Sequence, residues 1–375
     1  MFYHLLLTTK CDLQCIYCYG KSLKEMETEF ENFQIDYSVP SKISYEIETL
    51  KSFIEKDPEA VIIFYGGEPL LCIEEMEKIM DMVKAKHFII QTNGLHLDKV
   101  KPEYLKKLHT IFVSIDGDEP LTDYYRGKGV YRKIMENLQF IKEIGFKGEI
   151  IARMTVMEET DIYKQVLWLL NNPDYSFSSV HWQIDAGFWR SDIPERLGKF
   201  RKWVEESYNP GVRKLVKFWI DHMEKKGEVL RIYPFLAVTE SLLKGEKSLL
   251  RCGSGWINYS IQTDGHIIPC PIMSGMKDYY LGHIKNAHPL RLKKVYVGSP
   301  CTECEIFHEC GGRCLYANLT KRWPDEAYKL VCRTVKNLID SLKLGLPKVK
   351  KLISEGKISL KDFEHMKYNS CEVIP

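Results

Sequence analysis

The sequence predicts an α/β fold, in which a partial (β/α)6 barrel of the TIM type is followed by a C-terminal cysteine-rich domain. Six short apolar runs alternate with amphipathic stretches through the first two thirds of the chain. The runs are nearly continuous in apolar character, as expected of parallel strands covered on both faces. Six such units favour a barrel or an incomplete barrel over an open sheet. Ten of the twelve cysteines fall in two groups, which indicates metal sites.

The individual elements follow in chain order. The expected strands have the sequences YHLLLTT, AVIIFYGG, HFIIQTN, TIFVSIDG, EIIARMTV and SVHWQID. Apolar residues at helical spacing predict five helices between them, at residues 41–56, 73–84, 102–108, 130–144 and 161–170. Residues 193–243 have a helical pattern, and YSIQTDGHIIPC predicts a hairpin that turns at Asp264-Gly265. We expect a helical tail that breaks at residues 345–347, which contain glycine and proline.

These patterns predict four regions. Residues 1–192 form the barrel, and residues 193–245 form a helical bridging region. Residues 246–340 form the cysteine-rich domain, and residues 341–375 form a helical tail that ends in YNSCEVIP.

Charge and hydropathy exclude several classes of partner. The chain has 53 basic and 51 acidic residues, a net charge of +2, so it lacks the basic footprint of a nucleic-acid-binding protein. No apolar run approaches the ~20 residues of a transmembrane helix, and the start MFYHLLLTTK does not resemble a signal peptide. We therefore expect a cytoplasmic protein that binds neither nucleic acid nor a membrane. In a reducing cytosol, clustered cysteines indicate metal binding or catalysis rather than disulfides.

Polar residues follow four successive strands. They are the first three cysteines, then Gly66-Gly67-Glu68-Pro69, Thr92-Asn93-Gly94 and Ser114-Ile115-Asp116-Gly117. Each segment alone is a common turn signal. In barrels and doubly wound sheets, however, the active site gathers at the carboxyl ends of the strands. Four polar endings in succession therefore predict a site there.

Cys11, Cys15 and Cys18 follow the first strand with the spacing C-x3-C-x2-C. Three such cysteines within eight residues argue against an ordinary buried trio. A zinc site would need a fourth ligand, such as His4 or a distant cysteine, and a cluster used only for electron transfer normally takes four cysteines. The functional interpretation is a 4Fe–4S cluster with one iron left open, and the zinc site and the electron-transfer cluster stay open as alternatives.

This motif resembles that of the radical S-adenosylmethionine (SAM) superfamily, in which an aromatic residue, here Tyr17, precedes the third cysteine. The resemblance covers roughly residues 3–185. It implies that SAM binds the open iron and that its reductive cleavage yields a 5′-deoxyadenosyl radical, which abstracts hydrogen from an unactivated C–H bond. It also implies several SAM contacts: Gly66, Gly67, Glu68 and Pro69 at the amino group, Asn93 and Ser114 at the ribose and carboxylate, and Arg126 in YYRGKG.

Seven later cysteines have a spacing similar to that of the SPASM domain, an auxiliary-cluster module of many radical SAM enzymes. They are Cys252, Cys270, Cys301, Cys304, Cys310, Cys314 and Cys332. A zinc ribbon around Cys301 and Cys304 is the alternative, but a single zinc site would leave three or more of these cysteines without a metal. The resemblance implies one 4Fe–4S cluster on Cys301, Cys304, Cys310 and Cys332, and another on Cys252, Cys270 and Cys314. With the SAM cluster, the chain would hold three.

The cluster of Cys252, Cys270 and Cys314 lacks an evident fourth ligand, because no cysteine occurs in GSGWINYSIQ directly after Cys252. Substrate, water or Cys371 of the tail remain as alternatives. Cys371 could also be a free cysteine without a role in the tail. The end YNSCEVIP resembles a small peptide, so a third alternative is that it occupies the substrate channel. Cys72 is expected to be a buried core residue.

The resemblance implies a peptide or protein substrate and a modification such as a thioether, a cross-link or an oxidation. In the anaerobic sulfatase-maturating branch an Asp follows the cysteine that matches Cys270 and acts as a base; here Pro271 stands there, which argues against that activity. The candidate residues on the substrate side are Arg153, Gln183, Asp185 and Trp189. Asp185 is a candidate base or, equally, a cap of the next turn.

Two other classes of function stay open. The first is a radical SAM enzyme that acts on a small molecule in cofactor biosynthesis. The second is a protein without catalysis, either an iron–sulfur electron carrier or a zinc-stabilised structural protein. For the enzyme we expect an electron donor such as flavodoxin or ferredoxin, and an anaerobic or well-protected cell.

Overall fold

The computed structural model describes residues 1–18, 33–185 and 193–369. The chain divides into two compact units, each assembled from several segments. The first unit contains Met1–Ile115, Thr122–Ile151 and Ser254–Tyr296. The second contains Asp116–Leu121, Ala152–Gly253 and Val297–Pro375.

The first unit is built on a parallel sheet. Its strands are β1 (Phe2–Thr8), β2 (Val61–Gly66), β3 (His87–Thr92) and β4 (Leu108–Ser114), in the order β4-β3-β2-β1. Neighbouring strands pair in parallel, with Phe2 opposite Val61 and Val61 opposite His87. Their central residues are buried, which agrees with the nearly continuous apolar runs. The first four predicted strands are therefore confirmed, and their carboxyl ends lie along one edge of the sheet.

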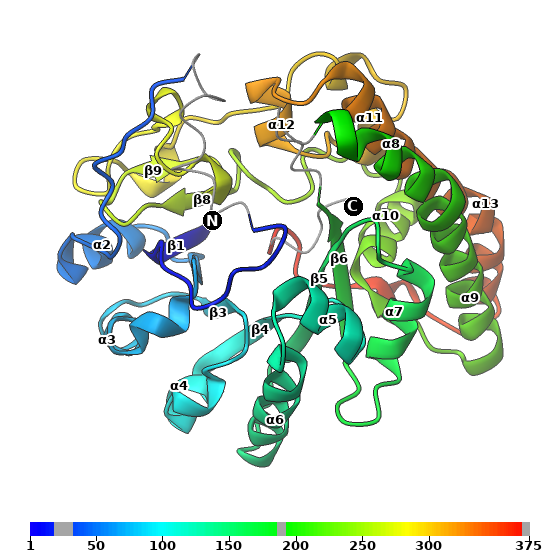
Figure 1. Cartoon of the computed structure of the whole chain (residues 1–375), viewed down its shortest axis with the longest axis horizontal. Coiled ribbons are helices and arrows are strands. Elements are labelled where there is room, and N and C mark those ends of the chain that lie inside the picture. The colour runs from blue at the N-terminus through cyan, green and yellow to red at the C-terminus, as the bar shows by residue number, and fades with distance from the viewer. Residues whose placement is uncertain (19–32, 186–192, 370–375) are drawn as a thin grey trace. The chain divides into compact units, whose positions relative to one another are not determined.

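Helices cover the outer side of these strands (Figure 1). They are α2 (Ile47–Ile54), α3 (Ile73–Met82), α4 (Pro102–Lys107) and α6 (Val130–Glu143). Helix α5 (Glu119–Arg126), between the fourth strand and α6, was not predicted. The predicted helix at residues 41–56 begins too early. Residues 41–44 instead hydrogen-bond to segments distant in sequence, with Ile43 N donating to Leu7 O of β1 (3.2 Å) and Ser44 N to Thr263 O (2.8 Å).

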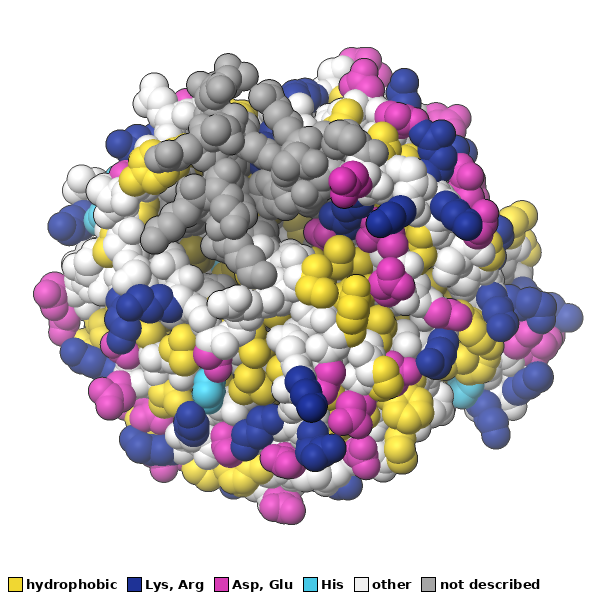
Figure 2. Space-filling model, viewed as in Figure 1, with side chains coloured by type: hydrophobic (Ala, Val, Ile, Leu, Met, Phe, Trp, Pro, Cys, Tyr) yellow, Lys and Arg dark blue, Asp and Glu magenta, His cyan; other side chains and the backbone are white. Residues whose placement is uncertain are grey.

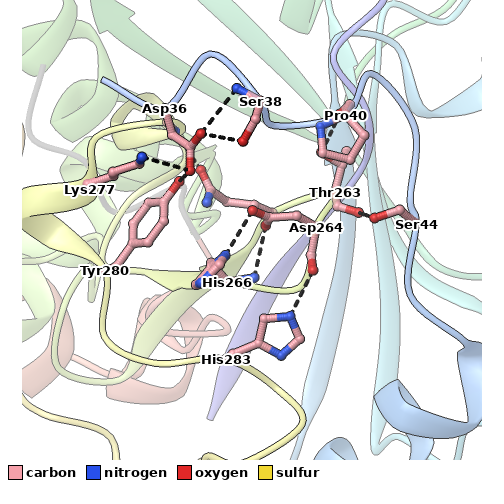
Figure 3. A network of polar contacts seen from close by, with 12 residues as sticks. Asp36, Ser38, Pro40, Ser44, Thr263, Asp264, His266, Lys277, Tyr280 and His283 are labelled. Atoms are coloured by element: carbon pink, nitrogen blue, oxygen red, sulfur yellow. Dashed lines mark hydrogen bonds and ion pairs between the residues drawn. The ribbon is translucent and has the colours of Figure 1, made fainter. Parts of the chain in front are cut away.

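The predicted hairpin at Asp264-Gly265 is confirmed. Strand β8 (Asn258–Ile261) pairs antiparallel with β9 (Ile267–Ile268), and β8 also extends the sheet by pairing in parallel with β1. Gly265 has φ +93°, a left-handed conformation that favours glycine. The turn is held by polar contacts around Asp264 (Figure 3). The backbone N–H of His266 donates to Asp264 Oδ1 (3.0 Å), and Nε2 of His283 donates to the Asp264 carbonyl (2.8 Å).

The second unit contains strands β6 (Ser179–Ile184) and β7 (Arg231–Ile232), which pair in parallel, and the greater part of β5 (Glu149–Val156). Its helices include α7 (Ile162–Leu170), α8 (Ile193–Trp203), a π-helical turn at Val204–Tyr208, α9 (Asn209–Lys226) and α10 (Tyr233–Lys244). The helical prediction for residues 193–243 is therefore confirmed except at residues 227–232, which include β7. That two-residue strand depends on a partner distant in sequence.

Three further helices complete the second unit: α11 (Phe307–Cys310), α12 (Leu315–Thr320) and α13 (Asp325–Ser354). Helices α9 and α13 pack side by side (Figure 1). The predicted break at residues 345–347 is wrong, because α13 continues through Pro347. A Cβ on Gly345 would lie 2.1 Å from Cδ1 of Ile220, so this glycine allows close packing on α9. Beyond the proline, Val349 is buried, and Lys348 forms ion pairs with Asp221 and Glu224, so contacts with α9 compensate for the missing hydrogen bond.

Short 3-10 helices occur at Pro69–Cys72, Leu97–Lys99, Pro271–Met273, Lys277–Tyr279, Pro289–Arg291, Cys301–Glu303 and Leu360–Phe363. None of the helices among the described residues is long and apolar enough to span a membrane. Figure 2 shows positive and negative side chains interspersed over the visible face rather than gathered into a large area of one sign.

Candidate functional site

The three-cysteine loop follows β1 directly. Leu13 N donates a hydrogen bond to Cys11 Sγ (3.4 Å), and Cys18 N donates to Cys15 O (3.1 Å), so the backbone turns around the sulfur atoms. Cys15 is buried, Cys18 is half-buried and Cys11 is exposed. None of the three forms a disulfide, so their sulfur atoms are available to a metal.

Two glycines bring the end of β2 against this loop. Gly67 N donates to Thr8 O and Glu68 N donates to Lys10 O, both at 2.8 Å. A Cβ on Gly66 would lie 2.3 Å from Thr8 O, and a Cβ on Gly67 would lie 2.1 Å from Lys10 O. Any larger residue would therefore push the two strand ends apart. The Gly-Gly pair is required by this close approach between backbones.

Glu68 braces the ends of β2 and β3. Its Oε1 accepts hydrogen bonds from Leu70 N (2.9 Å) and Thr92 Oγ1 (2.7 Å), and its Oε2 accepts one from Asn93 N (2.7 Å). The side chain is 1% exposed. Removal from water raises the pKa of Glu68 to about 7, although the three hydrogen bonds oppose the shift. The carboxylate therefore fixes the backbone that carries Asn93.

Asp12 ties the cysteine loop to the end of β3. Its Oδ1 accepts a hydrogen bond from Asn93 Nδ2 (2.8 Å), and its Oδ2 lies 2.7 Å from His96 Nε2. The sequence reasoning missed both Asp12 and His96. The position of Asp12 between two cysteines was an available signal, whereas nothing in the sequence indicated His96.

Tyr17 and Arg126 meet on the other side of the loop. The guanidinium of Arg126 lies 5.4 Å from the centre of the Tyr17 ring, and the Tyr17 and Tyr125 rings contact edge to face at 5.6 Å. Ile16 N donates to Tyr125 O (2.9 Å), which joins the loop to the end of α5. Arg126 is 7% exposed. Ser114, half-buried, is the last residue of β4 and belongs to the same row of strand ends.

These residues fit an iron–sulfur cluster with SAM. The donor set is three cysteine thiols on a loop that residues after β2 and β3 and at the end of α5 hold in place. A side chain at Gly66 or Gly67 would disrupt that arrangement. Three thiolates leave one iron of a 4Fe–4S cluster without a protein ligand. Backbone groups of residues 66–69 and the side chains of Asn93 and Arg126 surround the loop with polar donors and acceptors.

A second group of cysteines converges in the second unit. Partial removal from water, reinforced by the nearby Cys301 and Cys332, raises the pKa of Cys310 to about 12. Partial removal from water, together with Cys301 and Cys304, raises the pKa of Cys332 to about 11, while Arg313 opposes that shift. Thiols that affect one another in this way lie close together, and metal ligation would stabilise their thiolates. The donor set fits a four-cysteine cluster. Among the described residues, no three His, Cys, Asp or Glu side chains are arranged to hold a single metal ion.

The remaining cysteines are divided between the units. Cys252 and Cys314 belong to the second unit and Cys270 to the first. Cys314 is the N-cap of α12, where its Sγ accepts a hydrogen bond from Ala317 N (3.5 Å). Cys371 lies outside the described residues. Cys72 is 2% exposed, which confirms the prediction of a buried core cysteine.

The described candidate substrate-side residues lie on β5, on β6 and directly after β6. Arg153 Nη2 donates to Gln183 Oε1 (3.2 Å). Asp185 forms an ion pair with Arg196 (2.8 Å), and Arg196 Nε also donates to Glu158 Oε1 (2.8 Å). Burial alone would lower the pKa of Arg196, but the two carboxylates outweigh it and raise that pKa. The sequence reasoning missed this pairing of Asp185, and Trp189 lies outside the described residues.

At the carboxyl ends of the parallel strands, a three-cysteine loop lies against Gly66 and Gly67, and the buried carboxylate of Glu68 braces the neighbouring strand ends. The chain is therefore an α/β protein with a candidate iron–sulfur site at its strand ends. Residues 5–167 match the family model described as the Radical SAM superfamily. The chain therefore carries a radical SAM domain.

One curated relative spans most of the chain. It is the radical SAM cyclopropyl synthase TigE of Paramaledivibacter caminithermalis, 23% identical over 365 residues, which cover 90% of this chain and 73% of TigE. An uncharacterized protein of Archaeoglobus fulgidus is 24% identical over 326 residues, 82% of this chain and 72% of that protein.

Solved structures share the fold. Native anSMEcpe with bound AdoMet and Cp18Cys peptide has a TM-score of 0.66 at 19% identity, over 94% of this chain and 100% of that chain. SuiB of Streptococcus suis bound to precursor peptide SuiA has a TM-score of 0.51 at 16% identity, over 85% of this chain and 72% of that chain. The shared fold extends well beyond residues 5–167, into the cysteine-rich part of the chain.

Proposed function

We propose that this chain is a radical SAM enzyme with a SPASM-type domain that abstracts hydrogen from a peptide or protein substrate and installs a modification. The observation that carries the proposal is the cysteine loop, locked by Gly67, Glu68 and Asp12 at the carboxyl ends of β1–β3. The peptide in the anSMEcpe and SuiB structures supports a peptide as the substrate class.

In this proposal Cys11, Cys15 and Cys18 hold the first 4Fe–4S cluster. The backbone of Gly66–Pro69 and the side chains of Asn93, Ser114 and Arg126 orient SAM, with Tyr17 packed beneath the Arg126 guanidinium. Since both oxygens of Glu68 already accept hydrogen bonds, its main role is to hold Asn93 in place. When bound, the cluster and SAM supply the one-electron chemistry that removes hydrogen from an unactivated C–H bond.

Two auxiliary 4Fe–4S clusters complete the proposed cofactor set. Cys301, Cys304, Cys310 and Cys332 hold one. Cys252, Cys270 and Cys314 hold the other, whose fourth ligand is Cys371, substrate or water. Flavodoxin or ferredoxin is the proposed electron donor.

On the substrate side, Arg153 orients a polar group of the substrate and Asp185 accepts a proton. The ion pair with Arg196 holds the Asp185 carboxylate in place. Pro271 follows Cys270 and has no carboxylate, so it supplies no base next to that cysteine.

The test is formation of 5′-deoxyadenosine by the anaerobically reconstituted chain with SAM and a chemical reductant. We expect turnover in the wild type, none in Cys15→Ala, and iron near ~12 per chain for three 4Fe–4S clusters. Cys72→Ala is the matched control, because this buried thiol has no proposed ligand role and its removal leaves the iron content unchanged. No 5′-deoxyadenosine above the Cys15→Ala background would overturn the proposal. Turnover that no peptide stimulates, but a small molecule does, would overturn the substrate class alone.

A further inference from the structure

The hydroxyl of Tyr328 lies 2.9 Å from the sulfur of Cys301. Both residues belong to the second unit. Cys301 begins the 3-10 helix Cys301–Glu303, and Tyr328 lies in the first turn of α13. The spacing pattern of the cysteines did not single out Tyr328, which stands four residues before Cys332.

Ligation fixes the direction of this hydrogen bond. A free thiol and a phenol can each donate, but a metal-bound thiolate has no proton and can only accept. With a cluster on Cys301, Cys304, Cys310 and Cys332, as in the proposed function on which this step rests, Tyr328 must be the donor.

Asn318 supplies a second donor and holds the loop in place. Its Nδ2 lies 3.6 Å from Cys301 Sγ and 3.1 Å from Gly298 O, and its Oδ1 accepts a hydrogen bond from Gly298 N (2.7 Å). The side chain is 1% exposed, so water does not compete for these contacts. The Asn318 amide therefore fixes residues 298–301 and directs an N–H group at the sulfur.

Tyr328 is itself held in position. Its backbone N–H donates to Pro324 O (2.9 Å), which anchors it in the helix. The Trp323 ring lies 5.9 Å from the Tyr328 ring, and the guanidinium of Arg313 lies 5.5 Å from the Trp323 ring. The hydroxyl thus points at Cys301 from a fixed side chain rather than from a mobile one.

We propose that Tyr328, with Asn318, is a positioning residue that raises the reduction potential of the cluster bound by Cys301, Cys304, Cys310 and Cys332. The reduced cluster carries one more negative charge than the oxidised cluster. Hydrogen-bond donors to a ligating sulfur therefore stabilise the reduced state more than the oxidised state. This cluster accordingly accepts an electron more readily than it would without the tyrosine.

The test isolates this cluster in the full chain. In the background Cys11→Ala/Cys15→Ala/Cys18→Ala/Cys270→Ala, only the four-cysteine site keeps its complete ligand set. We would reconstitute this chain and its Tyr328→Phe derivative with iron and sulfide, and titrate both with dithionite and redox mediators while following the signal of the reduced cluster by electron paramagnetic resonance (EPR). Tyr328→Phe should lower the ratio of reduced to oxidised cluster about tenfold at a fixed potential, which is ~59 mV for a one-electron couple.

Tyr316→Phe is the matched control. Its hydroxyl accepts a hydrogen bond from Arg322 Nη1 (2.7 Å), so the ratio should stay unchanged. An exchangeable-proton coupling in electron–nuclear double resonance should also disappear in Tyr328→Phe and persist in Tyr316→Phe. If the Tyr328→Phe chain keeps its iron and shows the same ratio of reduced to oxidised cluster and the same exchangeable-proton coupling, this inference alone is overturned. If the chain with the four background substitutions binds no iron, the assignment of the four-cysteine cluster and this inference are overturned together. The proposed function is then still tested separately, by 5′-deoxyadenosine formation in the wild type.

Discussion

Nε2 of His96 lies 2.7 Å from Oδ2 of Asp12, although 84 residues separate them in sequence. Asp12 stands inside the cysteine loop, and His96 follows the end of β3. Through this contact, and through Asn93 on the other carboxylate oxygen, the loop is fixed by the strand ends as well as by its own turns. The proposed cluster would therefore bind to a preformed loop.

Removing the carboxylate of Asp12 should loosen the loop. Asp12→Ala loses two hydrogen bonds, each worth about 1 kcal/mol, and His96→Ala loses one. We expect both variants to lose iron from the first cluster more rapidly on chelation, with Asp12→Ala the more affected. Iron release is followed by absorbance under a chelator. His222→Ala on α9 is the control, because it removes a comparable contact, with Glu228 at 3.3 Å, and should leave the rate of iron release unchanged. Equal rates of iron release in all three variants would contradict the bracing role of Asp12 and His96.

Gly67→Ala should disrupt the first site. The added Cβ would lie 2.1 Å from Lys10 O, which is backbone and cannot rotate away. We expect a loss of about 2–4 kcal/mol in the free energy of unfolding in urea, and loss of SAM cleavage. Gly198→Ala in α8 is the control, because among the described residues no atom from outside its own helical turns lies within 4 Å of its Cβ position, and alanine favours a helix. A fully active Gly67→Ala variant would show that the close approach of β2 to the loop is unnecessary.

Glu68 should make stability depend on pH. Its pKa is raised by burial to about 7 in the folded chain, against 4.5 for an unperturbed glutamate. Because the pKa is higher in the folded state, that state binds the proton more tightly than the unfolded state. The contribution of Glu68 to stability is therefore greatest below pH 4.5. It falls by about 3 kcal/mol as pH rises through 7. Urea unfolding at pH 5, 6, 7 and 8 should show this fall in the wild type, and a smaller one in Glu68→Gln. Parallel pH profiles for the two proteins would contradict the assignment.

The pair of Asp185 and Arg196 should separate substrate chemistry from SAM cleavage. Asp185→Asn keeps the shape of the side chain but removes the proposed base. We expect 5′-deoxyadenosine to form at near wild-type rates while modified peptide falls at least tenfold, since general-base catalysis typically contributes ~100-fold or more. Arg196→Lys, which retains the positive charge, should form more modified peptide than Arg196→Gln. If Asp185→Asn lowers both products equally, Asp185 has a structural rather than a substrate-side role.

The parts of the fold that depend on local patterns could be predicted from the sequence. Each apolar run from β1 to β6 became a strand, because a strand buried on both faces needs little else to specify it. The strand ends likewise indicated Cys11, Gly67 and Asn93, since the chemistry of these residues is unusual for a core.

Contacts between distant segments could not be predicted. The pairing of β8 with β1 joins residues more than 250 positions apart, and residues 41–44 were drawn out of a helical pattern by Leu7 and Thr263. Helix α13 continues through Pro347 only because α9 lies against it. The hydroxyl of Tyr328 and the ring of His96 acquire their roles from partners that no local pattern reveals.

The most direct measurement of the central claim is the EPR spectrum of the reduced wild-type chain with and without SAM. If Cys11, Cys15 and Cys18 hold a cluster with an open iron, SAM should change the signal of that cluster. The change should be absent in Cys15→Ala, while the signals of the auxiliary clusters persist. A wild-type spectrum that SAM leaves unaltered, or one that SAM alters equally in Cys15→Ala, would contradict the account.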